Sequence, residues 1–265
     1  MGGNDAIGIF DSGVGGLTVL RALAEALPHE EFIYLADTGR YPYGTKSAET
    51  VTRYSLDNAD FLMGRGVKML VVACNTASAV SLDAIAARHR VPVVGVIEPG
   101  ARAAVARTRS GQVGVIATEG TIGSGAYTRA LRALAPSVEV FTRACPLLVP
   151  LAEEGWTEGP IARGVVETYL ASLARSGIDT LILGCTHYPL LKPVIGEVMG
   201  PEVGLVDSAE ETARDVAAAL VKNGIARPSG IGGTSLFVTD VPDRFVRIGR
   251  RFLGAQVESA VRIER

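Results

Sequence analysis

Two cysteines stand in the same kind of position, each directly after an apolar run. Cys74 follows Leu70–Ala73, and Cys185 follows Leu181–Gly184. Short apolar runs are typical of buried strands in parallel sheets, and the residues that come next favour helix starts. A thiol in front of a helix N-terminus commonly has a lowered pKa, because the helix dipole favours the thiolate. We therefore predict two reactive thiols at two strand ends.

Two thiols on opposite sides of one ligand would suit racemisation. Inverting a stereogenic carbon needs a base that removes a proton from one face and an acid that returns a proton to the other face. The two groups exchange roles in the reverse direction. Cys74 and Cys185 can form this pair if they face each other across a cleft. Asp11 could orient the first thiol, and His187, two residues after Cys185, could orient the second.

The cysteines could also serve different purposes. Free cysteine is among the most buried residue types, and we interpret Cys145, which has no polar neighbour, as a packing residue. A zinc site of Cys74, Cys185 and His187 would lack a C-x-x-C spacing and a fourth ligand. Cys185 and His187 could instead serve a hydrolase or lyase, which would leave Cys74 without a role. A module that only binds amino acids would gain little from two oxidisable groups.

Two loops have the composition of ligand-binding loops. Asp11–Gly16 leads from a strand into a helical pattern, and its glycines would let backbone N–H groups approach a carboxylate or phosphate. Its glycine spacing fits neither a P-loop nor the dinucleotide-binding fingerprint, so a tight turn that binds nothing is the alternative. Ala36–Thr45 is rich in turn residues and aromatics, and we expect it to line a pocket.

The order of elements predicts the fold. Strands and helices alternate along the chain, which indicates an α/β protein with mainly parallel sheets. A similar number of positions separates Asp11 from Cys74 and Thr118 from Cys185, so the halves resemble a duplicated unit. We predict two similar domains related by a pseudo-twofold axis, with the active site in the cleft between them.

The position of the last strand predicts where the domains divide. Ser235–Thr239 forms a strand that comes after the second half of the duplication, so we expect the tail to fold back onto the first domain. The first domain would then be discontinuous. Its predicted extent is residues 1–97 plus 208–265, and the second domain is residues 98–207.

The composition favours a small-molecule partner. The 265 residues are 48% hydrophobic and 20% charged, with a net charge of −2, which indicates neither disorder nor a nucleic-acid-binding surface. No apolar run approaches the roughly 18 residues of a membrane span, so we expect a cytoplasmic protein without membrane contact. Three cysteines, an odd number, argue against a disulfide framework. No sequence feature indicates a metal or an organic cofactor.

Four segments carry a family resemblance. They are Phe10–Gly16, Pro42–Gly44, Ala73–Ser78 and Gly184–Pro189. These segments resemble those of the cofactor-independent glutamate racemases of bacteria, and the similarity covers essentially the whole chain. The resemblance implies that the two cysteines are the acid/base pair, without pyridoxal phosphate, metal or flavin. It also implies that the substrate is glutamate and that the D-glutamate produced feeds peptidoglycan synthesis. Relatives are often dimers, so a homodimer is a further expectation.

The same resemblance implies which residues contact the substrate. These are Asp11, Ser12, Tyr43, Gly44, Asn75, Thr76, Thr118, Thr121, Thr186 and His187. An acidic residue of the site should lie at Glu153 or Glu154. Relatives that act on aspartate tend to carry Glu where this chain has His187, and this difference favours glutamate.

Overall fold

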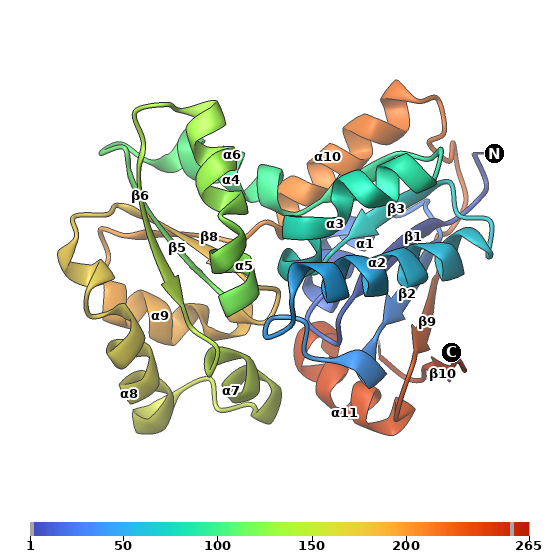
Figure 1. Ribbon diagram of the computed structural model, residues 1–265. Helices are drawn as coiled ribbons and strands as arrows, with labels where there is room; N and C mark the ends of the chain where they lie inside the picture. The colour runs from blue at the N-terminus through green and yellow to red at the C-terminus, as the bar shows by residue number, and fades with distance from the viewer. Residues whose placement is uncertain (1–2, 255–256, 265) are drawn as a thin grey trace.

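Two parallel sheets form the framework of the protein, one in each lobe (Figure 1). The computed structural model describes residues 3–254 and 257–264. The remaining residues, 1–2, 255–256 and 265, belong to the predicted first domain and lie outside the described residues. All strand pairs of the described chain are parallel, which confirms the predicted α/β class and its mainly parallel sheets.

The larger sheet has the strand order β10-β9-β2-β1-β3-β4. Its strands are β1 (Ile7–Asp11), β2 (Phe32–Ala36), β3 (Met69–Val72), β4 (Val93–Gly95), β9 (Thr234–Val238) and β10 (Val261–Arg262). The smaller sheet has the order β6-β5-β7-β8. Its strands are β5 (Gln112–Ala117), β6 (Glu139–Ala144), β7 (Thr180–Gly184) and β8 (Gly204–Val206).

The two sheets share one topology. The order β2-β1-β3-β4 in the first sheet matches β6-β5-β7-β8 in the second, strand for strand in sequence order. Cys74 follows β3 and Cys185 follows β7, so the two cysteines occupy equivalent strand ends. This shared order agrees with the predicted duplication and with two similar domains.

Helices cover both faces of the larger sheet. On one face lie α1 (Leu17–Ala26), α10 (Ala209–Lys222) and α11 (Pro242–Leu253), and on the other lie α2 (Ala48–Met63) and α3 (Asn75–Arg88). Ile7 and Ile9 point into the first core and Phe10 into the second, because side chains alternate along a strand. Burial of both faces explains why this strand is apolar up to Asp11 at its carboxyl end.

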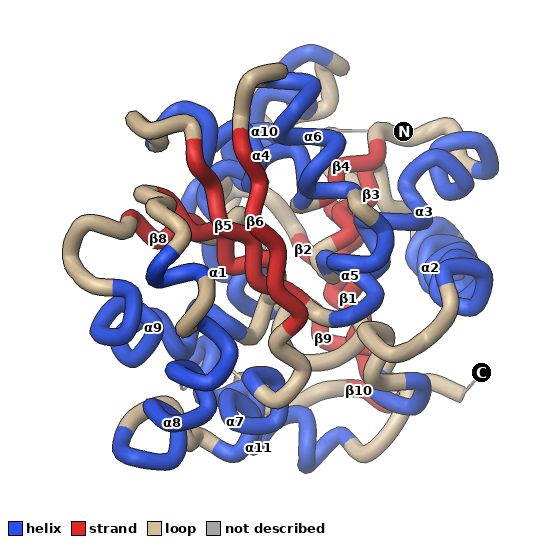
Figure 2. Tube along the Cα trace, turned by 60° about the vertical axis from the view of Figure 1, so that its left-hand side comes forward, coloured by secondary structure: helices blue, strands red, loops and turns tan. Residues whose placement is uncertain are grey.

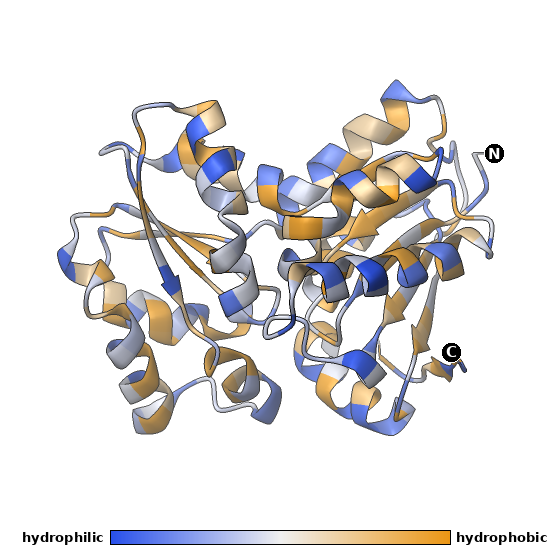
Figure 3. Ribbon diagram, in the orientation of Figure 1, coloured by the Kyte–Doolittle hydropathy of each residue, from blue (hydrophilic) through white to orange (hydrophobic). Residues whose placement is uncertain are grey.

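The smaller sheet is covered in the same way. One face packs on α4 (Ile97–Arg107) and α6 (Ala126–Leu134), and the other on α7 (Leu148–Glu154), α8 (Gly159–Leu170) and α9 (Lys192–Met199). Leu181 and Leu183 point into one core and Ile182 into the other. Figure 2 shows the helices around the two groups of strands, and Figure 3 shows hydrophobic residues on the strands and on parts of the helices that cover them.

Short elements complete the fold. They are α5 (Glu119–Ser124) and the 3₁₀ turns η1 (Thr38–Arg40), η2 (Leu173–Arg175) and η3 (Tyr188–Leu191). No helix among the described residues has both the length and the apolar character needed to cross a membrane.

The chain passes between the lobes twice. It leaves the first sheet after β4 and returns after β8, where α10 packs against α1. In the tail, β9 pairs with β2, so the last βα unit lies on the first sheet. The limits of the two domains at residues 97 and 207 stay a prediction.

Several elements differ from the sequence prediction. Helix α3 begins at Asn75, directly after Cys74, because Cys74 has extended backbone and serves as the N-cap. The sequence pattern did not indicate β6, β8, β10 or the helices α5 to α7. β6 was not predicted because it is an edge strand whose residues are exposed or half-buried, so it lacks a continuous apolar run.

Candidate active site

One cavity collects the loops that follow the strands of both sheets. It has a volume of about 110 Å³ and lies beyond the carboxyl ends of β1, β2, β3, β5 and β7. Its wall is formed by Ser12, Tyr41, Pro42, Tyr43, Gly44, Thr45, Cys74, Asn75, Thr76, Thr118, Glu119, Pro146, Val149, Pro150, Cys185, Thr186 and His187. Both cysteines therefore line one small cavity, and each lobe contributes one of them. A cavity of this size suits a small molecule.

Cys74 is buried at the N-cap of α3, and its thiol donates to Ser12 Oγ over 3.6 Å. Burial raises the pKa of Cys74 to about 12, and the negative charge of Asp11 adds to the rise. The amide of Ala77 opposes this shift but does not cancel it. The predicted lowering of this thiol's pKa by the helix N-terminus is therefore wrong, because desolvation of the thiolate outweighs the helix dipole.

Cys185 has a cationic partner. Its Sγ lies 3.8 Å from Nδ1 of His187, and both side chains are buried. Burial alone would lower the pKa of His187, but hydrogen bonds to Cys185 and Glu153 raise it to about 10. At neutral pH an imidazolium therefore lies beside this sulfur. The two cysteines differ in electrostatic surroundings, because Cys74 faces a carboxylate and Cys185 faces a cation.

Glu153 holds the other side of the imidazole. Its Oε1 lies 3.2 Å from Nε2 of His187, and its Oε2 lies 3.4 Å from Nη2 of Arg244 on α11. Burial alone would raise the pKa of Glu153, but hydrogen bonds from His187 and Tyr41 lower it. Glu154 is exposed. Of the two acidic residues left open by the sequence, Glu153 is the one that reaches the site.

Asp11 lies beneath the cavity and is not part of its wall. It is completely buried at the end of β1, where its Oδ2 accepts from the amide of Gly13 over 2.9 Å. Burial raises its pKa, and the positive charge of His187 opposes the rise. The predicted direct contact of Asp11 with the substrate stays a prediction, and the negative charge of Asp11 contributes to the raised pKa of Cys74. Asp11 was expected to orient the thiol of Cys74, and this thiol forms its hydrogen bond with Ser12.

The glycines after β1 allow the two lobes to approach closely. A Cβ atom on Gly15 would lie 2.2 Å from Thr186 Oγ1 and 2.5 Å from His187 Nδ1. The first-lobe loop thus touches the residues that follow Cys185. Ser12 is the one residue of the segment Asp11–Gly16 that lines the cavity. This close approach explains the glycine at position 15 without a bound anion.

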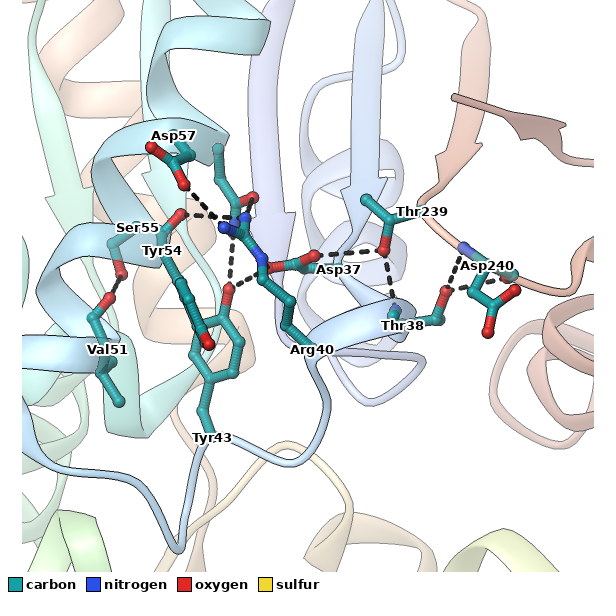
Figure 4. A network of polar contacts seen from close by, with 12 residues as sticks. Asp37, Thr38, Arg40, Tyr43, Val51, Tyr54, Ser55, Asp57, Thr239 and Asp240 are labelled. Atoms are coloured by element: carbon teal, nitrogen blue, oxygen red, sulfur yellow. Dashed lines mark hydrogen bonds and ion pairs between the residues drawn. The ribbon is translucent and has the colours of Figure 1, made fainter. Parts of the chain in front are cut away.

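A polar network anchors the loop after β2 (Figure 4). The buried carboxylate of Asp37 accepts from Arg40 Nε over 2.7 Å and from the hydroxyl of Tyr43. Arg40 also donates to Asp57 over 2.6 Å and to Asn58 over 3.0 Å. The network holds the cavity-lining loop from its outer side. The composition of this loop predicted that it lines a pocket, but it did not indicate which residues fix the loop.

Three threonine hydroxyls meet between the lobes. Thr76 Oγ1 lies 2.9 Å from Thr118 Oγ1 and 3.1 Å from Thr121 Oγ1, and the last two are 3.0 Å apart. Beside them the amide of Gly120 donates to the carbonyl of Gly44 over 2.8 Å. Thr76 and Thr118 line the cavity, whereas Thr121 lies behind them. Thr121 is thus the second predicted contact that does not form part of the wall.

The segment after β6 forms a part of the wall that was not predicted from the sequence. Pro146, Val149 and Pro150 line the cavity there, and Cys145 is buried in the core behind them. Recognising β6 as a strand would have placed this segment at the same sheet edge as the cysteines. Within the described chain, no group of three or more His, Cys, Asp or Glu side chains is placed to hold a metal ion.

Comparison with known proteins identifies the family. Residues 7–216 match the family described as Asp/Glu/Hydantoin racemase. The glutamate racemase of Geobacter metallireducens is 63% identical over 253 residues, which cover 95% of this chain and 94% of that protein. The chain belongs to the Asp/Glu/hydantoin racemase family. It is therefore an amino-acid racemase, an isomerase.

Solved structures agree with the fold of the racemase. The glutamate racemase of Thermus thermophilus, in complex with beta-chloro-D-alanine, has a TM-score of 0.91 at 47% identity, covering 100% of this chain and 98% of that one. The glutamate racemase of Francisella tularensis, in complex with D-glutamate, has a TM-score of 0.93 at 35% identity, covering 99% and 98%. The Picrophilus torridus aspartate racemase, 17% identical with a TM-score of 0.58, shares the fold alone.

Proposed function

We propose that the protein is a cofactor-independent glutamate racemase that interconverts L- and D-glutamate with Cys74 and Cys185 as its two acid/base groups. The observation that carries this proposal is the position of the two cysteines. They follow equivalent strands of two matching sheets, and both line one small cavity. The names of the relatives support glutamate as the substrate.

Binding would use the donors of the cavity wall. Ser12, Thr76, Thr118 and Thr186 present hydroxyls there, and Asn75 presents an amide. These neutral donors suit the two carboxylates of glutamate. Holding both carboxylates and the ammonium group fixes which face of Cα meets which sulfur, and such positioning replaces a bimolecular encounter by a preset geometry.

The proton transfers follow from the surroundings of the two sulfurs. At neutral pH Cys74 is a thiol, whereas Cys185 lies beside the imidazolium of His187. For one direction of the reaction we assign Cys185, beside the imidazolium, as the base and Cys74 as the acid. The Cα–H bond breaks toward Cys185, its electron pair passes into the α-carboxylate as a carbanion, and the proton of Cys74 then adds to the opposite face. The reverse reaction starts from the exchanged protonation state.

Exchange with deuterated solvent tests the two-base mechanism. With one base on each face, the product acquires deuterium at Cα at once, while the unreacted substrate stays unlabelled in initial turnover. A single base that serves both faces would return part of the original hydrogen, and proton-containing product would then rule out two separate groups. Parallel assays with glutamate and aspartate, monitored by circular dichroism, identify the substrate.

Replacement of the two cysteines tests their roles. Cys74→Ser and Cys185→Ser should each lower kcat by several orders of magnitude, because a serine hydroxyl is a far weaker acid than a thiol. Cys145→Ser is the matched control, since Cys145 is buried in the core outside the cavity wall. Turnover that persists in either of the first two variants would remove that cysteine from the mechanism.

The cellular role rests on the same proposal. We infer that the enzyme works in the cytoplasm as a homodimer and that its D-glutamate enters peptidoglycan synthesis. The similarity to bacterial glutamate racemases supports this role. Sedimentation of the purified protein tests the dimer. Deletion of the gene tests the role, because growth should then depend on added D-glutamate.

A further inference from the structure

Tyr127 connects the second lobe to the residue beside Cys74. It lies on α6 with 2% of its surface exposed, and its Oη lies 2.7 Å from Oδ1 of Asn75. Asn75 is the first residue of α3 in the other lobe and lines the cavity. The hydrogen bond therefore crosses from one lobe to the other and ends on a cavity-wall side chain.

The chemistry of the phenol decides which way the Asn75 amide points. Burial raises the pKa of Tyr127 well above its ordinary value, so the phenol keeps its proton. Asn75 is the one hydrogen-bond partner that this hydroxyl has among the described residues. If the amide were turned over, the phenol would accept from Nδ2, and its own buried proton would have no acceptor. Leaving a buried donor unpaired is costly, so Oδ1 must face Tyr127.

The other end of the amide then faces the cavity. Within the described chain, no hydrogen bond uses Nδ2 of Asn75, which leaves its two N–H groups for a ligand. We propose that Tyr127 is a positioning residue, which fixes the amide of Asn75 so that Nδ2 presents N–H donors to a substrate carboxylate. This inference rests on the proposed function, because it assigns that carboxylate to an acidic amino acid.

Two glycines leave the space that the side chain of Tyr127 occupies. A Cβ atom on Gly184 would lie 2.9 Å from Tyr127 Cε2, and one on Gly100 would lie 3.3 Å from Tyr127 Oη. Gly184 immediately precedes Cys185, just as Asn75 immediately follows Cys74. Tyr127 thus contacts the chain neighbours of both cysteines. Because Tyr127 and Asn75 belong to different lobes, the donor is oriented only when the lobes are together.

A double-mutant cycle tests the proposal. Tyr127→Phe removes the hydroxyl and keeps the ring, so we expect kcat/KM for glutamate to fall about 3- to 10-fold, the usual effect of losing one neutral hydrogen bond. The loss should be mainly a higher KM. In the Asn75→Ala background, Tyr127→Phe should change kcat/KM by less than about twofold, because the amide that the Tyr127 hydroxyl orients is absent. An equal loss in both backgrounds would show a general packing effect and overturn the proposal.

A second variant keeps the proposal testable if Tyr127→Phe does not fold. Asn75→Asp retains an oxygen that accepts from Tyr127 but turns an oxygen toward the cavity in place of the N–H donors. We expect a loss of more than about 100-fold in kcat/KM, because a carboxylate would face the substrate carboxylate. Activity close to that of the unmodified enzyme would overturn the proposal.

The controls separate this inference from the proposed function. Tyr169→Phe removes another phenol of the second lobe, one that accepts from the amide of Leu147, and should leave kcat/KM unchanged. If the unmodified enzyme itself racemises no glutamate, the proposed function is wrong. If the unmodified enzyme is active and Tyr127→Phe is equally active, the function stands and the assignment of Tyr127 is wrong.

Discussion

His187 lies between a sulfur and a carboxylate, with Nδ1 at 3.8 Å from Cys185 Sγ and Nε2 at 3.2 Å from Glu153 Oε1. This arrangement explains why the two cysteines differ in their electrostatic surroundings. Cys74 is held as a thiol by burial and by Asp11, whereas the second sulfur has a cation next to it. The two sulfurs thus have opposite electrostatic surroundings, which suits the proposed two-base mechanism.

The first prediction concerns Glu153. Hydrogen bonds to Cys185 and Glu153 raise the pKa of His187 to about 10, so the imidazolium is present below that pH and is lost above it. Glu153→Gln removes the carboxylate, and the pKa of His187 should fall. The alkaline limb of the kcat/KM profile should then move to lower pH by about one unit, which corresponds to about 1.4 kcal/mol.

The neighbouring residue supplies the control for this measurement. Glu154→Gln makes the same chemical change at an exposed position one residue along the chain. Its pH profile should match that of the unmodified enzyme. An unshifted alkaline limb in Glu153→Gln would contradict the assigned role of Glu153.

The second prediction separates stability from activity at Asp11. The pKa of Asp11 is raised in the folded protein, chiefly by burial, and its Oδ1 has no hydrogen-bond partner among the described residues. The folded state therefore holds the proton more tightly than the unfolded state. Ionisation of Asp11 therefore lowers the free energy of unfolding. This penalty is absent at pH values below about 3.8, grows as the pH rises, and is complete above the folded-state pKa.

Asp11→Asn removes this penalty. At neutral pH we expect the variant to be more stable by about 1–3 kcal/mol, the usual cost of an unsatisfied buried polar group, and to have a much lower kcat. Urea denaturation from pH 4 to pH 8 should show that the variant's advantage grows with pH. A constant difference across this range would show that the pKa of Asp11 is not raised in the folded enzyme, because the folded and unfolded states would then bind the same number of protons.

The third prediction concerns Arg40. Its guanidinium is the cation beside the fully buried carboxylate of Asp37, and its side chain is 23% exposed. Arg40→Met should lower the free energy of unfolding by about 2–4 kcal/mol, because a buried charge loses its partner. The KM for glutamate should also rise, since the loop that Arg40 and Asp37 anchor lines the cavity.

Arg88 offers a matched control for the change at Arg40. It forms an ion pair with Asp60 at 2.7 Å, but both side chains are exposed. Arg88→Met should cost less than about 1 kcal/mol and should leave KM unchanged. Equal losses in the two variants, measured by urea denaturation, would mean that burial of Asp37 adds nothing to the pair.

The sequence predicted the elements whose residues are buried on both faces. β1, β3 and β7 are completely buried, so their apolar runs were recognisable. The cysteines that come after β3 and β7 could therefore be placed at strand ends. β6 could not be found because its surface is partly exposed. The order of elements predicted only that the tail returns to the first domain. Its pairing partner, β2, was not predicted, since pairing depends on contacts that are distant in sequence.

The site was predicted less completely than the fold. Residue types at strand ends identified Cys74 and Cys185. The pKa of Cys74, however, depends on burial and on the charge of Asp11, and no sequence pattern indicates how strongly either acts. Glu153 and Glu154 are adjacent on a helix, so only its packing decides which one faces His187. The partnership of Tyr127 with Asn75 joins two lobes and could not be inferred from either segment alone.

The last prediction concerns the contact between the lobes at Gly15. A Cβ atom there would meet Thr186 Oγ1 at 2.2 Å and His187 Nδ1 at 2.5 Å, distances that real Cβ atoms do not show. Gly15→Ala must therefore displace the imidazole or separate the lobes, and kcat/KM should fall by at least about 100-fold, because small displacements of catalytic groups are costly. Gly164→Ala on α8, where an added Cβ would meet nothing, should raise the free energy of unfolding by about 0.5–1 kcal/mol and leave kcat/KM unchanged. Full activity in Gly15→Ala would mean that the lobes do not meet at this point during turnover.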